Sequence, residues 1–453
     1  MIRCAATHRS RPSSPRVPNQ IRVHLDVTLF GHVQEVLHIG HARAGIYRVV
    51  EQTARSLDAV PDVALTLSAA HSPEAAYAHV RAHRELRGVR FAIPGRKRLG
   101  HQLNQRVVRA YSARGAHPPI MLPTRAANTV LHVANRVLDV SAAGMDGVVR
   151  IDLPLRPRPD VFHSPSHPLP DRRARTKGTR CFITVHDVIP LIHPEFCSWG
   201  GLKWLHLVLE SIGPEDRVLA VSESTRRDLL AARPDIAPDR VRVAHLAADR
   251  ERFYRCDDPT RVASVRTKYG IPDAPYVLSV GTLEPRKNLP HLLRSFAAAV
   301  RQERLRDLHL VLTGDRGWNY DAIFASADQL GDLRDRVIFA GYVDDADLAP
   351  LYTGALMFAY PSLYEGFGLP PLEAMQCGAP VIASNTSSLP EVVGDAGILV
   401  DPRDPDALAH AIVQVYRDGA LRERLVRQSS ARAATFTWAR YADQLVAAYR
   451  DSL

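Results

Sequence analysis

The chain has 453 residues, a hydrophobic content of 46 percent and a formal net charge of +10 at pH 7. These values exclude a disordered or fibrous protein and predict two or three domains, each with its own core. No apolar run reaches the ~18 to 20 residues of a membrane-spanning helix. The five cysteines are odd in number and include no Cys-x-x-Cys pair, which predicts reduced thiols, a reducing compartment and no metal site.

The charge is concentrated at the start of the chain, where residues 1–250 carry +14 and residues 251–453 carry −4. Residues 1–19 contain Arg, Ser and Pro but no acid and no apolar signal-peptide core. This composition also resembles an organellar transit peptide, but we favour a disordered leader on a cytoplasmic protein.

The densest basic segment runs from Pro94 to Gly115 and contains no acid. Its cations are Arg96, Lys97, Arg98, Arg106, Arg109 and Arg114. Apolar residues recur between them at helical spacing, a pattern that suits an anionic membrane surface and a solvated helix equally well. Nucleic acid is not expected as a partner, since aromatic residues are scarce in the segment and no recognised binding module is present.

The first elements in chain order are a predicted strand over Ile21–Phe30 and a helix from about Ala44, with Gly45 at its start. Residues 67–150 mix helix and strand patterns without a clear order. A short strand is predicted over Val161–His163.

A second apolar run, Cys181–Val185, places His186 and Asp187 at its C-terminal end. Ligands of open α/β sheets bind at this end of the strands, so we expect His186 to line a site and Asp187 to brace the turn or orient that histidine. His163 and His167 have a spacing that metal ligands use, but they lie in a proline loop with no third ligand nearby. We therefore predict no metal there.

Two later segments organise the middle of the chain. Ser222 and Ser224 follow a strand and are suited to cap the next helix. Residues 249–273 are predicted to cross into a second domain and to contain its first helix.

From Pro275 the pattern changes to a strand, a glycine turn at Gly281 and a helix whose apolar residues recur at helical spacing. The turn carries Arg286 and Lys287. Two fixed cations at such a turn suit a pyrophosphate, because Arg can bind two oxygens at once and Lys acts as a point charge. The alternative is a solvated basic turn.

The segment YEGFGLPPLEAMQCGA, residues 364–379, places Glu365 and Glu373 eight residues apart around the start of a helix. Its glycines let the backbone approach a ligand, and its prolines suit a first helical turn whose free N–H groups attract anions. Gly378 is suited to end the helix. The spacing predicts one carboxylate on the loop and one on the helix, as in a nucleotide-sugar site; a paired-acid glycosidase and a buried helix with incidental acids are alternatives.

Two Asp-x-Asp patterns are also present, at Asp345 and Asp347 and at Asp404 and Asp406. Each begins a predicted helix, so we interpret these residues as helix N-terminal acids and not as metal ligands. The turn GTLEPRK lacks the GxGxxG pattern of a dinucleotide fold, which argues against a dehydrogenase.

Residues 275–408 resemble the C-terminal domain of the retaining glycosyltransferases of family 4. The resemblance rests on GTLEPRKN, LVLTGD, VIFAGYVDDADLAPLY, the Glu-x7-Glu segment and PVIASNTSSLPEVVGDAGILVDPRDPDAL, in the order of that family. It implies the GT-B fold, an α/β architecture of two Rossmann-like domains that face each other across a cleft. The acceptor-binding domain would span residues 20–256, the nucleotide-sugar domain residues 257–435, and residues 436–453 would form a helix that returns to the first domain.

The resemblance also implies roles in donor binding. It assigns Arg286 and Lys287 to the diphosphate, Glu373 to the ribose, and Glu365 with the Gly366–Leu369 amides to the sugar and its phosphate. It places His186 against the donor sugar. The softer assignments are Gly45 beside the phosphate, where the family often has two glycines, the backbone of Gly341, Tyr342 and Val343 along the nucleobase, and Leu348 packing nearby. The donor-binding loop would thus include Gly366, Phe367, Gly368 and Leu369.

The implied function is a retaining, metal-independent hexosyltransferase without a cofactor, with mannose or rhamnose favoured. The donor would be a nucleotide sugar and the acceptor a glycan or lipid-linked glycan of cell-surface polysaccharide, such as lipopolysaccharide. The protein would be cytoplasmic, with the basic segment as an option for peripheral attachment to the inner face of the membrane. A noncatalytic membrane-associated scaffold and a nucleotide-sugar hydrolase or epimerase of the same fold are the alternatives.

Overall fold

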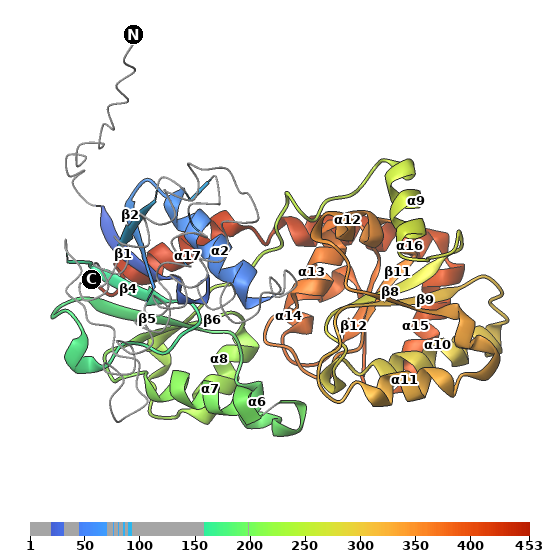
Figure 1. The fold of residues 1–453 in the computed structure, drawn as a ribbon, viewed down its shortest axis with the longest axis horizontal. Coiled ribbons are helices and arrows are strands. Elements are labelled where there is room, and N and C mark those ends of the chain that lie inside the picture. The colour runs from blue at the N-terminus through green and yellow to red at the C-terminus, as the bar shows by residue number, and fades with distance from the viewer. Residues whose placement is uncertain are drawn as a thin grey trace, which may run out of the picture.

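The computed structural model describes residues 20–30, 45–69, 76, 80, 85–86, 89–92, 158–197 and 199–453. The predicted leader at 1–19 and the basic segment at 94–115, for which membrane binding and a solvated helix were both considered, lie outside these residues. The described chain contains two sheets of parallel strands, each with helices around it. The two sheets lie side by side along the long axis of the molecule (Figure 1).

The first sheet has seven strands in the order β3-β2-β1-β4-β5-β6-β7. They are Arg90–Ala92, Val63–Ser68, Ile21–Asp26, Val161–Ser164, Arg180–Val185, Arg217–Ala220 and Val241–Val243. Every pairing is parallel, and the central strands are buried on both faces, as their continuous apolar runs predict. The helices of this part are α2 (Ile46–Asp58), α6 (Ile189–Ile192), α7 (Trp199–Glu210) and α8 (Glu223–Ala232).

The second sheet has six parallel strands in the order β10-β9-β8-β11-β12-β13. They are Val337–Gly341, His309–Thr313, Tyr276–Val280, Met357–Tyr360, Val381–Ser384 and Ile398–Val400. Its helices are α9 (Pro259–Lys268), α10 (Leu289–Glu303), α11 (Asp321–Asp328), α12 (Asp345–Thr353), α13 (Leu369–Gln376), α14 (Leu389–Val393), α15 (Pro405–Arg417) and α16 (Gly419–Ala434). The predicted α/β architecture with two Rossmann-like sheets is confirmed.

The last helix, α17 (Trp438–Arg450), returns from the second sheet to the first, where it lies beside α2 (Figure 1). The hydroxyl of Tyr441 is 3.2 Å from the Thr53 hydroxyl of α2, and the Tyr449 hydroxyl is 2.7 Å from Nδ1 of His163. The other ring nitrogen of His163 is 2.8 Å from the Thr184 hydroxyl. Both ring nitrogens of His163, which is fully buried, therefore have protein hydroxyls as partners.

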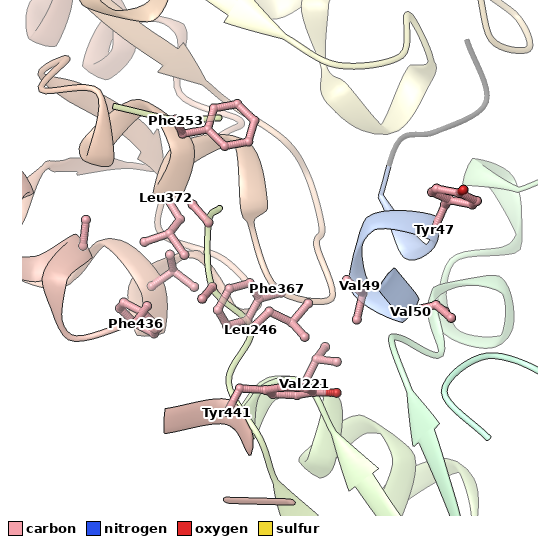
Figure 2. Packing of buried hydrophobic residues seen from close by; sticks show 14 of the residues in the cluster. Tyr47, Val49, Val50, Val221, Leu246, Phe253, Phe367, Leu372, Phe436 and Tyr441 are labelled. Atoms are coloured by element: carbon pink, nitrogen blue, oxygen red, sulfur yellow. The ribbon is translucent and has the colours of Figure 1, made fainter. Parts of the chain in front are cut away.

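One hydrophobic cluster continues from the first sheet into the second (Figure 2). Val49 and Val50 of α2 belong to it, as do Leu246 on the crossing segment and Phe367 and Leu372 near the start of α13. Burial of this shared surface fixes the two sheets relative to each other, and it places the carboxyl ends of both around one cavity. Among the described residues, no helix has both the length and the apolar character needed to cross a membrane.

Two local predictions need correction or refinement. The first strand was expected to reach Phe30 but ends at Asp26, because Oδ1 of Asp26 accepts hydrogen bonds from the Thr28 amide at 3.0 Å and its hydroxyl at 2.5 Å and turns the chain. The α8 cap is Ser222 alone, whose hydroxyl accepts from the Thr225 amide at 3.0 Å, while Ser224 lies inside the helix.

Candidate donor site between the two sheets

A cavity of about 450 Å³ lies between the carboxyl ends of the two sheets. Thirteen of the fourteen predicted site residues line it: Gly45, His186, Arg286, Lys287, Tyr342, Val343, Leu348, Glu365, Gly366, Phe367, Gly368, Leu369 and Glu373. Gly341 does not; it ends β10 with a φ of 66°, and its carbonyl accepts from the Gly314 amide at 2.8 Å. The structure thus brings together residues that lie up to 328 positions apart, from Gly45 to Glu373.

The basic turn that follows β8 is held by the backbone. Residues Pro285–Lys287 form a single 3₁₀ turn, and Asn288 then adopts a left-handed conformation with a φ of 56° before α10 begins. The Asn288 side-chain amide donates to the carbonyls of Pro361 at 3.2 Å and Pro402 at 2.8 Å. Asparagine tolerates this conformation better than most residues, so the turn is fixed in the position that directs both cations to the cavity.

Glu365 binds both cations of this turn. Its Oε1 accepts from Lys287 Nζ at 2.7 Å and its Oε2 lies 2.6 Å from Nη1 of Arg286. The hydroxyls of Ser362 and Tyr360 also donate to Oε1, at 2.7 and 2.9 Å. Burial raises the pKa of Glu365, but the charges of Arg286 and Lys287 outweigh burial and lower it to about 2. This carboxylate therefore stays ionised and positions other groups, and it cannot act as a general acid near neutral pH.

A second carboxylate, Glu284, completes this charge cluster. Its Oε1 accepts from Nη2 of Arg286 at 2.5 Å, and its side chain is buried. Burial lowers the pKa of Lys287, and so does the neighbouring charge of Arg286. Two cations thus face two carboxylates, which makes the empty cluster nearly neutral. Sequence analysis did not predict Glu284, although its place two residues before Arg286 in the same turn was a usable signal.

Helix α13 begins at the cavity, as the sequence predicts. Gly368 has a φ of 113°, Pro370 and Pro371 lie in the first turn, and Gly378 ends the segment with a φ of 79°. These positive φ angles suit glycine and strain other residues. The positive end of the α13 dipole therefore faces the cavity between the loop carboxylate Glu365 and the helix carboxylate Glu373.

Glu373 is buried, with 7 percent of its surface exposed, and burial raises its pKa. The Tyr352 hydroxyl donates to its Oε2 at 3.1 Å, and Nη1 of Arg48 lies 3.6 Å from its Oε1. Arg48 comes from the first turn of α2 and also forms an ion pair with Asp345 at the start of α12. Asp345 in turn accepts from Nη1 of Arg252 at 3.1 Å.

Arg48 was not among the predicted site residues, and Asp345 was predicted only to start a helix. Asp345 does begin α12, but its carboxylate is bound by Arg48 and Arg252 from elsewhere in the chain. A signal for Arg48 was present, because a cation in the first turn of a helix opposes the helix dipole and requires an acidic partner. The second acid of this pattern, Asp347, is paired with Arg261 and Lys268. No group of three or more metal-ligating side chains occurs in the described parts of the chain.

His186 lies at the end of β5 and faces the loop before α13. Its Nε2 donates to the Pro165 carbonyl at 2.7 Å, so Nδ1 is left as an acceptor. Burial lowers the pKa of His186, which favours this neutral form. Asp187 accepts from the Ile189 amide at 3.0 Å and so braces the turn, one of the two roles predicted for it.

Gly366 lies in direct contact with the first part of the chain. A Cβ added to Gly366 would lie 2.1 Å from the His186 carbonyl oxygen, so only glycine fits there. The Gly366 carbonyl accepts from the hydroxyls of Ser222 at 2.6 Å and Thr225 at 3.0 Å. The loop that carries Glu365 is thereby joined to β5 and α8 of the first part.

Comparison with known proteins agrees with this geometry. The family model described as glycosyl transferases group 1 matches residues 263–432. The O-antigen chain mannosyltransferase B of Escherichia coli is 36 percent identical over 291 residues, which are 64 percent of this chain and 74 percent of that relative. The serotype-specific mannosyltransferase WbdA of Escherichia coli is 32 percent identical over 256 residues, but these span only 31 percent of its length and 56 percent of this chain. Among solved structures, Anabaena HepE in complex with UDP and glucose has a TM-score of 0.61 at 15 percent identity, with 95 percent of this chain and all of that chain covered.

Proposed function

Because the chain belongs to the glycosyl transferases group 1 family, we propose that it is a retaining mannosyltransferase that extends a cell-surface polysaccharide from a nucleoside diphosphate mannose. Its identity as a glycosyltransferase follows from the family. The mannosyl donor and the polysaccharide acceptor are supported by two relatives with mannosyltransferase names, one of which is an O-antigen chain enzyme. The acceptor is a glycan or a lipid-linked glycan.

The observation that carries this proposal is the set of charged groups around one cavity. Arg286, Lys287 and Glu373 all line it, and so do Gly368 and Leu369 at the start of α13. A nucleotide sugar has a partner for each of them, with a diphosphate for the cations and the helix, and ribose hydroxyls for the carboxylate. The nucleobase then extends along Tyr342 and Val343.

Transfer requires stabilisation of the diphosphate as the bond between the anomeric carbon and the phosphate oxygen breaks. Fixed cations and a helix N-terminus supply this stabilisation in a site that excludes water. The acceptor hydroxyl attacks the anomeric carbon on the face that the phosphate leaves, the phosphate oxygen takes the hydroxyl proton, and the configuration is retained. Neutral His186 accepts a sugar hydroxyl through Nδ1, and Glu365 holds the two cations in place.

Saturation-transfer NMR with GDP-mannose, UDP-glucose and dTDP-rhamnose tests the donor assignment. We expect wild type to bind GDP-mannose and the double variant Glu373→Ala, Lys287→Ala to lose this binding. The control is Lys268→Ala, Glu303→Ala, which also removes one cation and one carboxylate but at the surface, where the side chains are 50 and 35 percent exposed. The control should bind as wild type does.

Absence of binding of all three donors by wild type would overturn the proposal in favour of a scaffold. Release of free mannose from a bound donor at the same rate with and without an oligosaccharide acceptor would identify a hydrolase instead. Metal independence is part of the proposal, because the fixed cations supply the charge that a metal would otherwise provide. Transfer should therefore continue in the presence of EDTA.

A further inference from the structure

Arg48 is the one cationic side chain that the first sheet and its helices contribute to the described wall of the donor cavity. It projects from the first turn of α2, 18 percent exposed, and lies between two carboxylates of the second part of the chain. Its Nη2 binds Oδ1 of Asp345, and its Nη1 is 3.6 Å from Oε1 of Glu373. The guanidinium also lies over the Phe253 ring, 5.7 Å from its centre. These contacts fix the cation from three directions.

The distance to Glu373 is informative because it is too long for a hydrogen bond but short enough for strong charge attraction. Oε2 of Glu373 already accepts from the Tyr352 hydroxyl at 3.1 Å. Oε1 of Glu373 is therefore attracted by the positive charge of Arg48, while its lone pairs remain available to accept hydrogen bonds from a ligand. Two adjacent hydroxyls of a ribose are donors of the required kind.

The hydrogen bond to Asp345 explains why Arg48 does not close onto Glu373. Asp345 is also bound by Nη1 of Arg252 at 3.1 Å, and Arg252 lies 3.6 Å from Glu51 of α2. This network holds the guanidinium back from Oε1. A direct Arg48–Glu373 hydrogen bond would instead compete with a ligand.

We propose that Arg48 is a positioning residue for the donor, which keeps the carboxylate of Glu373 charged and open to the ribose hydroxyls and makes nucleotide binding depend on the contact between α2 and the second sheet. The inference rests on the proposed function, since it requires that a nucleotide occupies the cavity. It adds a cation to Gly45 and His186, the residues of the first half of the chain already assigned to the donor cavity.

Calorimetric titration of the full chain with GDP, UDP and dTDP tests the inference. We expect Arg48→Gln to weaken binding of the preferred nucleotide about tenfold, and Arg48→Lys, which keeps the charge, to weaken it by less than about threefold. The control is Arg22→Gln. Arg22 lies on β1 in the first part of the chain and binds the carboxylate of Asp160 at 2.9 Å, but it does not line this cavity and shares no partner with Arg48.

Kinetics with the sugar donor distinguish a role in donor positioning from a general loss of active-site structure. The ribose lies away from the reacting carbon, so Arg48→Gln should raise the donor KM about tenfold and leave kcat within about twofold. A double-mutant cycle locates the effect. In a Glu373→Gln background, Arg48→Gln should cause no further loss of affinity, because the carboxylate through which Arg48 acts is already absent.

The pH profile gives a third readout. Removing the charge of Arg48, while the like charge of Asp345 remains, raises the pKa of Glu373 further, so affinity in Arg48→Gln should increase as the pH is raised. Binding by wild type should depend less on pH. The charged and titratable groups facing Glu373 are Arg48, Arg252, Asp345, Tyr352 and Cys377.

The outcomes separate the two proposals. If wild type binds no nucleotide, the proposed function fails. If wild type binds a nucleotide but Arg48→Gln and Arg22→Gln bind it equally well, the function stands and the role of Arg48 is overturned. If Arg48→Gln does not fold, the double variant Arg48→Gln, Glu373→Gln is used, because it removes the cation and the carboxylate together. A nucleotide affinity lower than that of Glu373→Gln alone would contradict the inference.

Discussion

The ionised state of Glu365 is the residue-scale feature with the clearest consequence for stability. The folded-state pKa of about 2 lies below the ordinary value of 4.5, so folding favours the charged form. The stabilisation is complete above about pH 4.5 and is lost as the pH falls toward 2. Replacing one partner of a buried ionic cluster leaves the other charges uncompensated.

We therefore expect Glu365→Gln to lower the free energy of unfolding by about 3 kcal/mol at pH 7. The difference from wild type should narrow steadily between pH 4.5 and pH 2, where the wild-type carboxylate also becomes neutral. Urea denaturation at a series of pH values measures this. The control is Glu303→Gln, which removes a carboxylate whose side chain is 35 percent exposed and pairs with Arg417. It should lower the free energy of unfolding by less than about 1 kcal/mol. If the difference in free energy of unfolding between Glu365→Gln and wild type did not change with pH, the ion pairs of Glu365 would not contribute to stability.

At the same scale, the sequence predicts which residues face the cavity better than it predicts how they pair. The spacing of Glu365 and Glu373 around a glycine turn places one on the loop and one on the helix, as found. That Glu365 binds Arg286 and Lys287 was not predictable, because these partners precede it by 79 and 78 residues and meet it only after β11 pairs with β8. An acidic partner for Arg48 could be expected from its place in a first helical turn, but the identity of that partner could not, since Asp345 and Glu373 belong to the other half of the chain.

At the scale of elements, the two Asp-x-Asp patterns differ in what they do. Asp404 caps α15, and its Oδ1 accepts from the amides of Asp406 and Ala407, both at 3.0 Å. Asp345 begins α12 without capping it and joins the Arg48 network. The sequence predicted the helix starts correctly, because Asp and Pro at a helix start are a local signal. The long-range partners of Asp345 have no local signal.

We expect Asp404→Ala to lower the free energy of unfolding by about 1 kcal/mol, the usual cost of a lost N-cap, and to leave kcat/KM of transfer unchanged. Asp404→Asn should retain the stability, because asparagine caps as well as aspartate does. Urea denaturation and a transfer assay measure both quantities. A loss of activity in both variants with stability intact would restore the metal-ligand interpretation of this pattern.

The limits of prediction at this scale follow from where the local signals lie. Strands β5 and β8 are continuous apolar runs bounded by polar turns, and their observed bounds, Arg180–Val185 and Tyr276–Val280, differ from the expected ones by a residue. The first strand was predicted too long because Val27, Leu29 and Phe30 continue its apolar pattern, while the side chain of Asp26 ends it. The end of β1 was thus set by the hydrogen bonds of one side chain, which the apolar periodicity does not reveal.

At the scale of the whole molecule, the donor cavity exists because the two sheets are held together by several separate contacts. Gly366 is bound by Ser222 and Thr225, and Tyr364 donates to Asp228 at 2.7 Å. Glu391 of α14 accepts from the Glu223 amide at the start of α8, at 2.9 Å. Each contact joins the second part of the chain to α8 or to Ser222, its N-cap residue.

The Gly366 contact gives the sharpest test of this arrangement. Gly366→Ala adds a Cβ that would lie 2.1 Å from the His186 carbonyl and 2.9 Å from Cβ of Asp187, so the two halves of the cavity must move apart. Overpacking of this kind costs ~1–3 kcal/mol. Because the strain opposes closure of the cavity, we expect kcat to drop roughly tenfold to a hundredfold.

The control for this variant is Gly419→Ala at the start of α16, where the nearest atom to an added Cβ is a flexible Arg422 nitrogen at 3.5 Å. It should leave kcat unchanged. Donor hydrolysis without acceptor supplies a second measurement, since a cavity that no longer closes admits water. Gly366→Ala should therefore raise the ratio of hydrolysis to transfer. An unchanged ratio together with an unchanged kcat would mean that the contact between β5 and the α13 loop is not needed for the reaction.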